Sequence, residues 1–215
     1  MGRCLVITSI IVLAIAVWFA VIDLNRDAYY VFDPEVLHKV GRETALMKNL
    51  TSHEKIRRIT TELAKIYPKH IDTHEEWIFN VAGGAMGHMT LLHTSITEYV
   101  IIFGTPIGTE GYSGRFMADD YFTIIDGEQH SYYPGEIEPR IFKAGDRNIM
   151  PRGLATGYKM PAKTYALEYA RGNVPLMLPF GIVQTFTSTL DFHTLVDLFY
   201  HYGRIVIDQF MVGKI

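Results

Sequence analysis

A run of 19 residues without a charged side chain, Cys4–Ile22, lies near the start of the sequence. At about 1.5 Å of rise per residue, a helix of this length spans roughly 28 Å, close to the hydrocarbon core of a bilayer. A cleaved signal peptide is the alternative, with Ala14 and Ala16 as its small-residue site, yet Val17–Ile22 continues the apolar run. We therefore predict a retained transmembrane anchor over residues 1–25.

Composition limits what the rest of the chain can be. The formal net charge of -3 over 215 residues excludes a strongly basic nucleic-acid-binding protein. A content of 48% hydrophobic and 13% aromatic residues excludes a disordered chain. The single cysteine, Cys4, excludes an internal disulfide and cysteine-ligated zinc. The length fits one folded domain with a small accessory segment.

Beyond the anchor, the hydrophobic pattern changes twice. Residues 26–80 contain an amphipathic helix that begins at the capping box Thr51–Glu54. Residues 81–172 are rich in strand patterns, with Asp126-Gly127 as a predicted hairpin turn, and their spacing indicates a barrel or jelly roll. Residues 173–215 return to helical periodicity. We predict two amphipathic helices there, on a membrane surface or over the barrel mouth, with ordinary core helices as the alternative.

The predicted strand Thr164–Ala170 carries one carboxylate between small residues. Alternation places Glu168 on the same face as Ala166 and Ala170. If this face points inward, the alanines leave space for a ligand and burial raises the pKa of Glu168, which makes it a proton donor at neutral pH. If it points outward, Glu168 is an ordinary solvated charge.

Asp119 and Asp120 form a second acidic site, just before the apolar strand Tyr121–Ile125. Alternation sends one aspartate to each face of that strand. Two carboxyls in a dry cavity do not both ionise cheaply, so one holds a proton while the other stays anionic, which suits proton transfer. The spacing leaves open which of the two points inward, and two surface aspartates are the alternative.

Other chemistries have less support in the sequence. The histidines and acids of residues 70–76 lie in a polar turn and match no established metal-ligand spacing. The glycines of residues 104–114 lack the Gly-Lys-Ser or Gly-Lys-Thr ending of a phosphate loop. The sequence also has no Gly-x-Ser-x-Gly elbow, which disfavours covalent hydrolysis. We therefore predict no metal site and no cofactor.

Several motifs occur together along most of the chain: Asn80–Gly87, Glu98–Val100 with Phe103–Thr105, Ser113–Arg115, Tyr133–Glu136 and Glu168–Gly172. In this combination the chain resembles the fungal sterol delta-8 to delta-7 isomerase family, which also contains the sigma non-opioid receptor. The resemblance implies an α+β protein of the endoplasmic reticulum membrane. It would have one N-terminal transmembrane helix, a cupin-like β-barrel around the ligand site and two C-terminal membrane-associated helices as a lid. The receptor branch alone implies a homotrimer.

The resemblance also implies site residues. The family's ligand-binding glutamate falls on Glu168, which strand alternation also singles out, and a pocket aromatic falls on Tyr99. The receptor's second pocket aspartate aligns with Phe122, and the acid three residues earlier aligns with Asp119. Asp119 is therefore the preferred catalytic partner of Glu168, with Asp120 as its substitute. The ligand-binding residues that we predict are Tyr99, Phe103, Phe122, Ala166 and Ala170.

Together these observations predict a cofactor-independent isomerase that shifts a sterol double bond from position 8 to position 7. A neutral Glu168 would protonate carbon 9, and a carboxylate or water would take the proton from carbon 7, although the two roles can be reversed in a coupled pair. Ionised Asp119 and the aromatic rings would stabilise the carbocation.

An ammonium mimics this cation, so cationic amphiphilic amines are expected to inhibit. The substrate is expected to enter from the lipid bilayer. The main alternative is a non-catalytic, sigma-receptor-like binder of such amines in the endoplasmic reticulum. A metal-dependent cupin enzyme is a third reading, which the absence of a His-x-His segment from the barrel region disfavours.

Overall fold

Ten strands form two antiparallel sheets in the computed structural model, which describes residues 6–10, 13, 17, 20–21, 24 and 26–215. The larger sheet has the order β1-β2-β3-β10-β5-β8, and the smaller has the order β4-β9-β6-β7. The bounds are β1 Ile78–Ala82, β2 Ala85–Thr94, β3 Glu98–Thr105, β4 Thr109–Tyr112, β5 Ala118–Asp126, β6 Glu128–Tyr132, β7 Arg140–Lys143, β8 Arg147–Met150, β9 Gly157–Met160 and β10 Thr164–Gly172.

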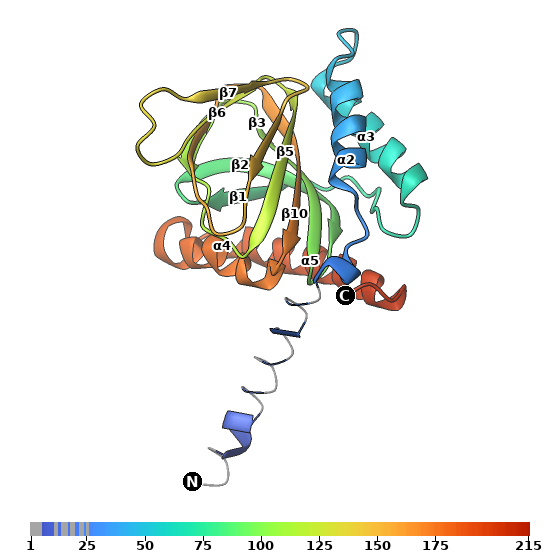
Figure 1. Cartoon of the computed structure of the whole chain (residues 1–215), viewed down its shortest axis with the longest axis vertical. Helices are drawn as coiled ribbons and strands as arrows, with labels where there is room; N and C mark the ends of the chain where they lie inside the picture. Colours follow the sequence, from blue (N-terminus) through green and yellow to red (C-terminus); the bar gives the residue numbers. More distant parts are fainter. Residues whose placement is uncertain (1–5, 11–12, 14–16, 18–19, 22–23, 25) are drawn as a thin grey trace.

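Two pairs of helices cover the sheets on different sides. Figure 1 shows α2 and α3 beside the larger sheet, and α4 and α5 below both sheets. α2 contacts β5 and β10, whereas α5 contacts β1 and β2. The bounds are α2 Pro34–Ala45, α3 Ser52–Ile66, α4 Leu178–Gln184 and α5 Phe192–Met211, with short helical turns at Arg26–Tyr29, Val174–Leu176 and Thr185–Thr189.

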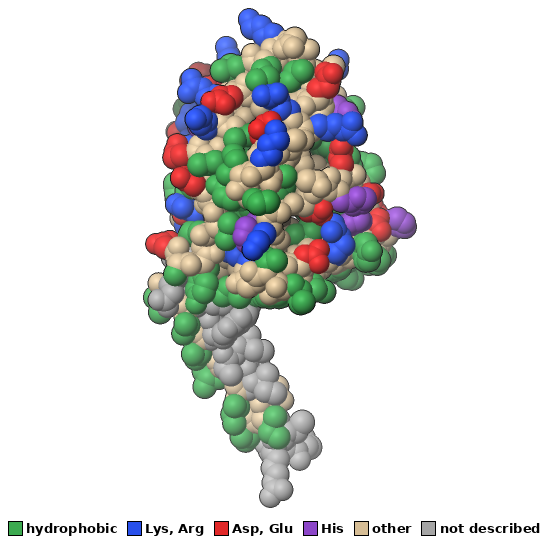
Figure 2. All heavy atoms as spheres, turned by 90° about the vertical axis from the view of Figure 1, so that its right-hand side faces the viewer, with side chains coloured by type: hydrophobic (Ala, Val, Ile, Leu, Met, Phe, Trp, Pro, Cys, Tyr) green, Lys and Arg blue, Asp and Glu red, His purple; other side chains and the backbone are tan. Residues whose placement is uncertain are grey.

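α3 begins at the predicted capping box. Thr51 Oγ1 accepts a hydrogen bond from the Glu54 backbone N–H at 3.3 Å, and the Glu54 carboxylate accepts one from the Thr51 N–H at 2.7 Å. Ile56, Ile59 and Leu63 point from the helix into the core. The opposite faces of α2 and α3 carry intermixed positive and negative side chains, as Figure 2 shows, so this side of the molecule is a solvated face.

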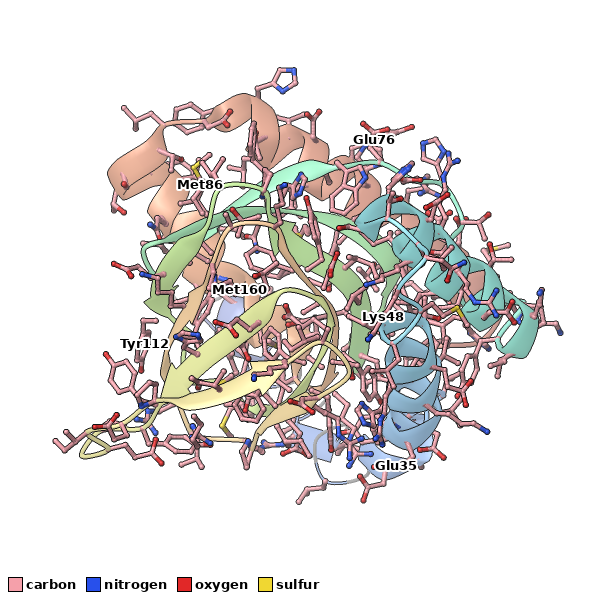
Figure 3. The ribbon with its side chains drawn as sticks, turned by 90° about the horizontal axis from the view of Figure 1, so that it is seen from above. Glu35, Lys48, Glu76, Met86, Tyr112 and Met160 are labelled. Carbon is pink, nitrogen blue, oxygen red and sulfur yellow. The ribbon has the colours of Figure 1, made fainter. Side chains whose placement is uncertain are left out.

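The core has two layers because β10 alternates. Leu167 and Tyr169 point toward α2 and α3, into a layer that includes Phe32. Ala166 points the other way, into the space between the two sheets, where it packs in the same cluster as Met160. Figure 3 shows Met160 inside this space, and Glu35 and Glu76 at the outer edge of the molecule. The functional groups of the fold lie in the layer between the sheets.

The strands do not close into the single barrel that we predicted. Hydrogen-bonded pairing runs within two separate sheets, so the expectation of a closed cupin-like barrel is corrected.

The predicted hairpin at Asp126-Gly127 is also wrong, because the two strands that flank the turn belong to different sheets. Gly127 makes the turn with φ of +74°, but β5 then pairs with β8 and β10, while β6 pairs with β7 and β9. The turn is a corner between the sheets, where Thr164 Oγ1 accepts from the Glu128 N–H at 3.4 Å.

Within the described residues, no helix is both long and apolar enough to cross a membrane. The predicted anchor over residues 1–25 falls in large part outside these residues. α5, which has 20 residues, carries Asp197, Arg204 and Asp208. The prediction of an N-terminal transmembrane helix, and of a single-pass protein of the endoplasmic reticulum membrane, is therefore corrected. The helices predicted for residues 173–215 are present as α4 and α5, and they cover one end of the sheets.

Candidate active site

The register of β10 between β3 and β5 places the polar groups of the site. Ala170 pairs with Tyr99 on one side and with Asp120 on the other. Glu168 lies two residues earlier on the same face and pairs with Phe122. Diagonal neighbours on one sheet face are close enough for long side chains to interact. The small side chain of Ala170 therefore leaves Tyr99 and Asp120 free to extend toward Glu168 from opposite sides.

These side chains line a pocket between the two sheets. The empty volume between its atoms, including solvent at the mouth, is about 1140 Å³, which is enough for a ligand of several fused rings. Leu198 and Tyr202 of α5 and Phe180 of α4 cover one end. Among the described residues that line the pocket there is no lysine, arginine or histidine. The carboxyl groups therefore face an apolar space without a cationic partner.

Glu168 is 9% exposed, and the hydroxyl of Tyr99 donates a hydrogen bond to its Oε1. Burial raises the pKa of Glu168 to about 7, and the hydrogen bond from Tyr99 opposes this rise by stabilising the carboxylate. The pKa of Tyr99 is raised far above its usual value by burial and by the nearby Asp120 and Glu168. Tyr99 therefore stays protonated and acts as a fixed donor to Glu168.

Asp120 is the second buried acid of the pocket. It is 3% exposed, and its Oδ1 has no hydrogen-bond partner among the described residues. Burial, and then the charge of Glu168, raise the pKa of Asp120 well above its usual value. On the opposite sheet, burial and the same two acids raise the pKa of Tyr158. The Tyr99 hydroxyl stabilises the carboxylate form of Glu168, whereas Asp120 Oδ1 has no donor among the described residues, so this arrangement favours the shared proton on Asp120.

The structure places Asp120, and not Asp119, in the pocket. The Asp119 carboxylate accepts a hydrogen bond from the Arg152 backbone N–H at 3.0 Å and lies 3.9 Å from Arg171 Nε, outside the pocket. This is the outcome of strand alternation, which sends adjacent residues to opposite faces. Asp119, the partner of Glu168 that the resemblance favoured, therefore lies outside the pocket, and Asp120, its predicted substitute, lies in the pocket.

The other predicted site residues lie at or beside the pocket. Tyr99, Phe103 and Phe122 line it with Glu168. Ala166 and Ala170 are fully buried and lie in the adjoining apolar clusters. Their small size leaves room for the carboxyl groups. Within the described residues, no group of three or more histidines, cysteines or acids is placed to hold a metal ion.

Three polar residues of the pocket were not predicted from the sequence. They come from the smaller sheet and from the edge strand of the larger sheet. Gln129 comes from β6, Tyr158 from β9 and Asn148 from β8. Alternation within these short strands gives two faces, but it does not show which face meets β10. Only the pairing of β8 with β5 and the packing of the two sheets bring these residues opposite the acids.

Comparison with known proteins is consistent with this geometry. The model of a family described as "ERG2 and Sigma1 receptor like protein" matches residues 8–214. The chain belongs to this family. A C-8 sterol isomerase from Aspergillus fumigatus is 46% identical over 207 residues, covering 96% of this chain and 87% of that protein. The C-8 sterol isomerase ERG2 of Gibberella zeae is 44% identical over 194 residues, covering 90% and 83%.

The ERG2 and Sigma1 receptor like family also includes receptors. Sigma non-opioid intracellular receptor 1 of Gallus gallus is 41% identical over 168 residues, covering 77% of this chain and 74% of the receptor. Among solved structures, an RmlC-like cupin from Shewanella frigidimarina has a TM-score of 0.40 and 18% identity over 48% of this chain and 90% of that protein. The two isomerases thus match a larger share of this chain than the Gallus gallus receptor does.

Proposed function

We propose that the chain is a C-8 sterol isomerase, which moves a ring double bond of a sterol from position 8 to position 7. One observation carries the proposal. Glu168 and Asp120, whose pKa values are both raised by burial, lie on the same face of the larger sheet in an apolar pocket that has no lysine, arginine or histidine in its described lining. An alkene is a weak base, so its protonation needs an acid group that still carries its proton at neutral pH, held in a dry site, and an anion that stabilises the cation.

The proposed mechanism uses the two carboxyls in sequence and needs no cofactor. Asp120, which holds a proton, transfers it to carbon 9, and the double-bond electrons form the new C–H bond. The positive charge is then at carbon 8, where the carboxylate of Glu168 and the rings of Phe103 and Phe122 stabilise it. Glu168 removes a proton from carbon 7, whose C–H electrons form the new double bond. Glu168 then loses this proton to water, and Asp120 takes up a new proton from water.

The same site is expected to bind cationic amphiphilic amines as inhibitors. An ammonium group near Glu168 resembles the positive charge of the intermediate, and its apolar part occupies the space intended for the rings of the sterol. An ion pair in a dry pocket requires that the carboxylate be paired, which an ammonium provides. This proposal rests on the geometry of Glu168 and on the absence of a competing cation from the described lining of the pocket.

The test is conversion of a delta-8 sterol in deuterated water, followed by mass spectrometry. The wild-type chain should form the delta-7 product with one deuterium at carbon 9. Glu168→Gln and Asp120→Asn should each lower kcat by about a thousandfold, because each removes one proton-transfer group. The matched control is Asp119→Asn, one residue away but outside the pocket, which should keep most of the activity.

Two results would count against the proposal, and a third would change the roles of the two acids. Amine binding without turnover by a folded wild-type chain would identify a non-catalytic, receptor-like binder. Loss of activity in Asp119→Asn, with Asp120→Asn unaffected, would show that the wrong aspartate had been assigned. Loss of deuterium uptake at carbon 9 in Glu168→Gln alone would reverse the donor and acceptor roles within the pair.

A further inference from the structure

Two buried amide side chains line the pocket and have no role in proton transfer. Asn148 Nδ2 donates a hydrogen bond to Gln129 Oε1 at 2.9 Å, and the two residues are 5% and 2% exposed. Asn148 comes from the edge of the larger sheet and Gln129 from the smaller sheet, so this bond joins the sheets. Among the described residues, neither side chain has another hydrogen-bond partner.

This pair retains unused hydrogen-bonding groups. The amide of Gln129 keeps its two N–H donors, and Asn148 keeps its carbonyl oxygen and one N–H. Polar groups in an apolar cavity are costly unless they are satisfied. A hydroxyl group both donates and accepts, so it can accept from Gln129 and donate to Asn148 at once. The described pocket lining contains no lysine, arginine or histidine, which disfavours an anionic ligand group beside these amides.

The register also fixes how far this pair lies from the acid. Glu168 on β10 pairs with Phe122 on β5, and Phe122 pairs with Asn148 on β8. The three residues form one row across the sheet, with all three side chains lining the pocket. Two strand spacings separate Glu168 from Asn148, which is about 10 Å between their backbones. A rigid ring system lying over Phe122 would therefore reach both ends of the row.

We propose that Gln129 and Asn148 bind the hydroxyl group on carbon 3 of the sterol and thereby set which ring carbons lie at the carboxyl pair. This inference rests on the proposed isomerase function. In a sterol, carbon 3 is on the first ring, whereas carbons 7, 8 and 9 are on the second. A rigid polycycle held by its hydroxyl at Asn148 places the second ring toward Glu168 and Asp120. Gln129 and Asn148 are positioning residues.

The test compares a delta-8 sterol with its 3-deoxy analogue, using the full chain. Wild type should prefer the hydroxylated sterol by about tenfold or more in kcat/KM, with part of the effect in kcat because the deoxy compound loses its alignment. The double variant Gln129→Met/Asn148→Leu replaces both partners by apolar groups of similar size, which is the change least damaging to folding. It should convert the two compounds at similar kcat/KM.

Thr156→Val is the matched control. Thr156 also lines the pocket, but its hydroxyl bonds within the protein to Met150 Sδ at 4.0 Å. This variant should keep the wild-type preference for the hydroxylated sterol. A wild type without such a preference, or a double variant that retains it in full, would overturn the proposal even if the isomerase is active.

Failure of the isomerase function gives a different result. If the wild type converts neither compound, equilibrium binding of the same two compounds is measured instead. Tighter binding of the hydroxylated sterol by about tenfold, abolished in the double variant, would support the hydroxyl site while the isomerase proposal fails. Equal binding of both compounds by the wild type would overturn the hydroxyl site as well.

Discussion

Glu168 and Glu98 are both buried, but their partners differ in kind. The Glu98 carboxylate lies 2.7 Å from Lys214 Nζ and accepts backbone hydrogen bonds from Val31 and Phe32 at 2.9 and 3.2 Å. Glu168 has only the hydroxyl of Tyr99 as a hydrogen-bond donor among the described residues. Glu98 is therefore fixed in place by several partners that include a lysine, whereas Glu168 has no cationic partner in the described pocket lining. The sequence shows both as glutamates in strands and does not distinguish their partners.

The raised pKa of Glu168 predicts a cost to stability. Between pH 4.5 and about 7 the folded protein keeps a proton on Glu168 that the unfolded chain has lost, so this group lowers stability as the pH rises. Glu168→Gln removes the effect. We expect the variant to become more stable than wild type by about 3 kcal/mol at pH 8, and by much less at pH 5. Urea unfolding at both pH values measures the difference.

The free energy of unfolding of the wild type alone does not isolate the effect of Glu168, because His93 also changes stability with pH. Burial lowers the pKa of His93 to about 3, so its contribution to stability increases as the pH rises between about 3 and 6.5, opposite in sign to that of Glu168. His93 is present in both proteins and cancels in the comparison. A stability difference that does not grow with pH would contradict the assigned pKa shift of Glu168.

A second prediction at the residue scale concerns Tyr99, whose hydroxyl affects the pKa of Glu168. The hydroxyl of Tyr99 lowers the pKa of Glu168, so Tyr99→Phe should raise that pKa further. If Glu168 acts as the base, the acidic limb of the pH profile of kcat should move to higher pH, and kcat at pH 7 should fall by about tenfold. A profile that keeps its midpoint would assign Tyr99 to packing alone.

At the scale of elements, local patterns predict strands and helices well and their partners poorly. The capping box at Thr51 and the alternation along β10 are confirmed because both depend on neighbouring residues only. The turn at Asp126-Gly127 is present, but the predicted hairpin is not, since a turn sequence does not specify which strand its neighbour pairs with. Alternation likewise does not show whether Asp119 or Asp120 points into the pocket, because this depends on which face of β5 meets the other sheet. The structure places Asp120 there.

One element-scale contact carries a prediction for folding. Glu98 of β3 joins the segment Val31–Phe32 to Lys214, which is 4% exposed, and Tyr169 of β10 donates to the same carboxylate at 2.7 Å. Glu98→Gln leaves the lysine charge buried without an anion. We expect a loss of about 3–5 kcal/mol in the free energy of unfolding, measured by guanidinium unfolding.

The double variant Glu98→Gln/Lys214→Met is the control for this effect. It removes the unpaired charge together with its partner and should recover a large part of the lost stability. A single variant that loses less than about 1 kcal/mol, or a double variant no more stable than the single one, would show that the ion pair contributes little.

At the scale of the whole molecule, the pocket exists only because two sheets and two helices meet. Its lining comes from strands of both sheets and from α4 and α5, which are far apart in the sequence. The periodicity of one segment does not predict contacts with distant segments. The prediction of an enclosed site therefore came from the family resemblance. The closed barrel that the same resemblance implied is wrong. The comparisons with known proteins support the predicted isomerase function. The transmembrane helix that we predicted from the length of the apolar run is not supported within the described residues.

The enclosed acid pair makes ligand binding depend on pH. A quaternary ammonium amphiphile, whose own charge is constant, should bind the ionised form of Glu168. Below the pKa of about 7 its affinity should rise by up to about tenfold per pH unit and then level off. Thermal stabilisation of the whole protein between pH 5 and 8 measures this, with Glu168→Gln as the control. Affinity that is constant with pH would place the ammonium elsewhere.

The junction at Glu98 also has a consequence for how the chain is made. Lys214 follows Glu98 by more than a hundred residues, so a ribosome must add all of β4 to α5 before this carboxylate meets its cation. Until then β3 carries a charge that cannot be buried cheaply. The Glu98 side chain therefore gains this partner only after α5 and Lys214 have been synthesised. The nascent sheets are expected to reach their final packing only after Lys214 has been synthesised, rather than strand by strand.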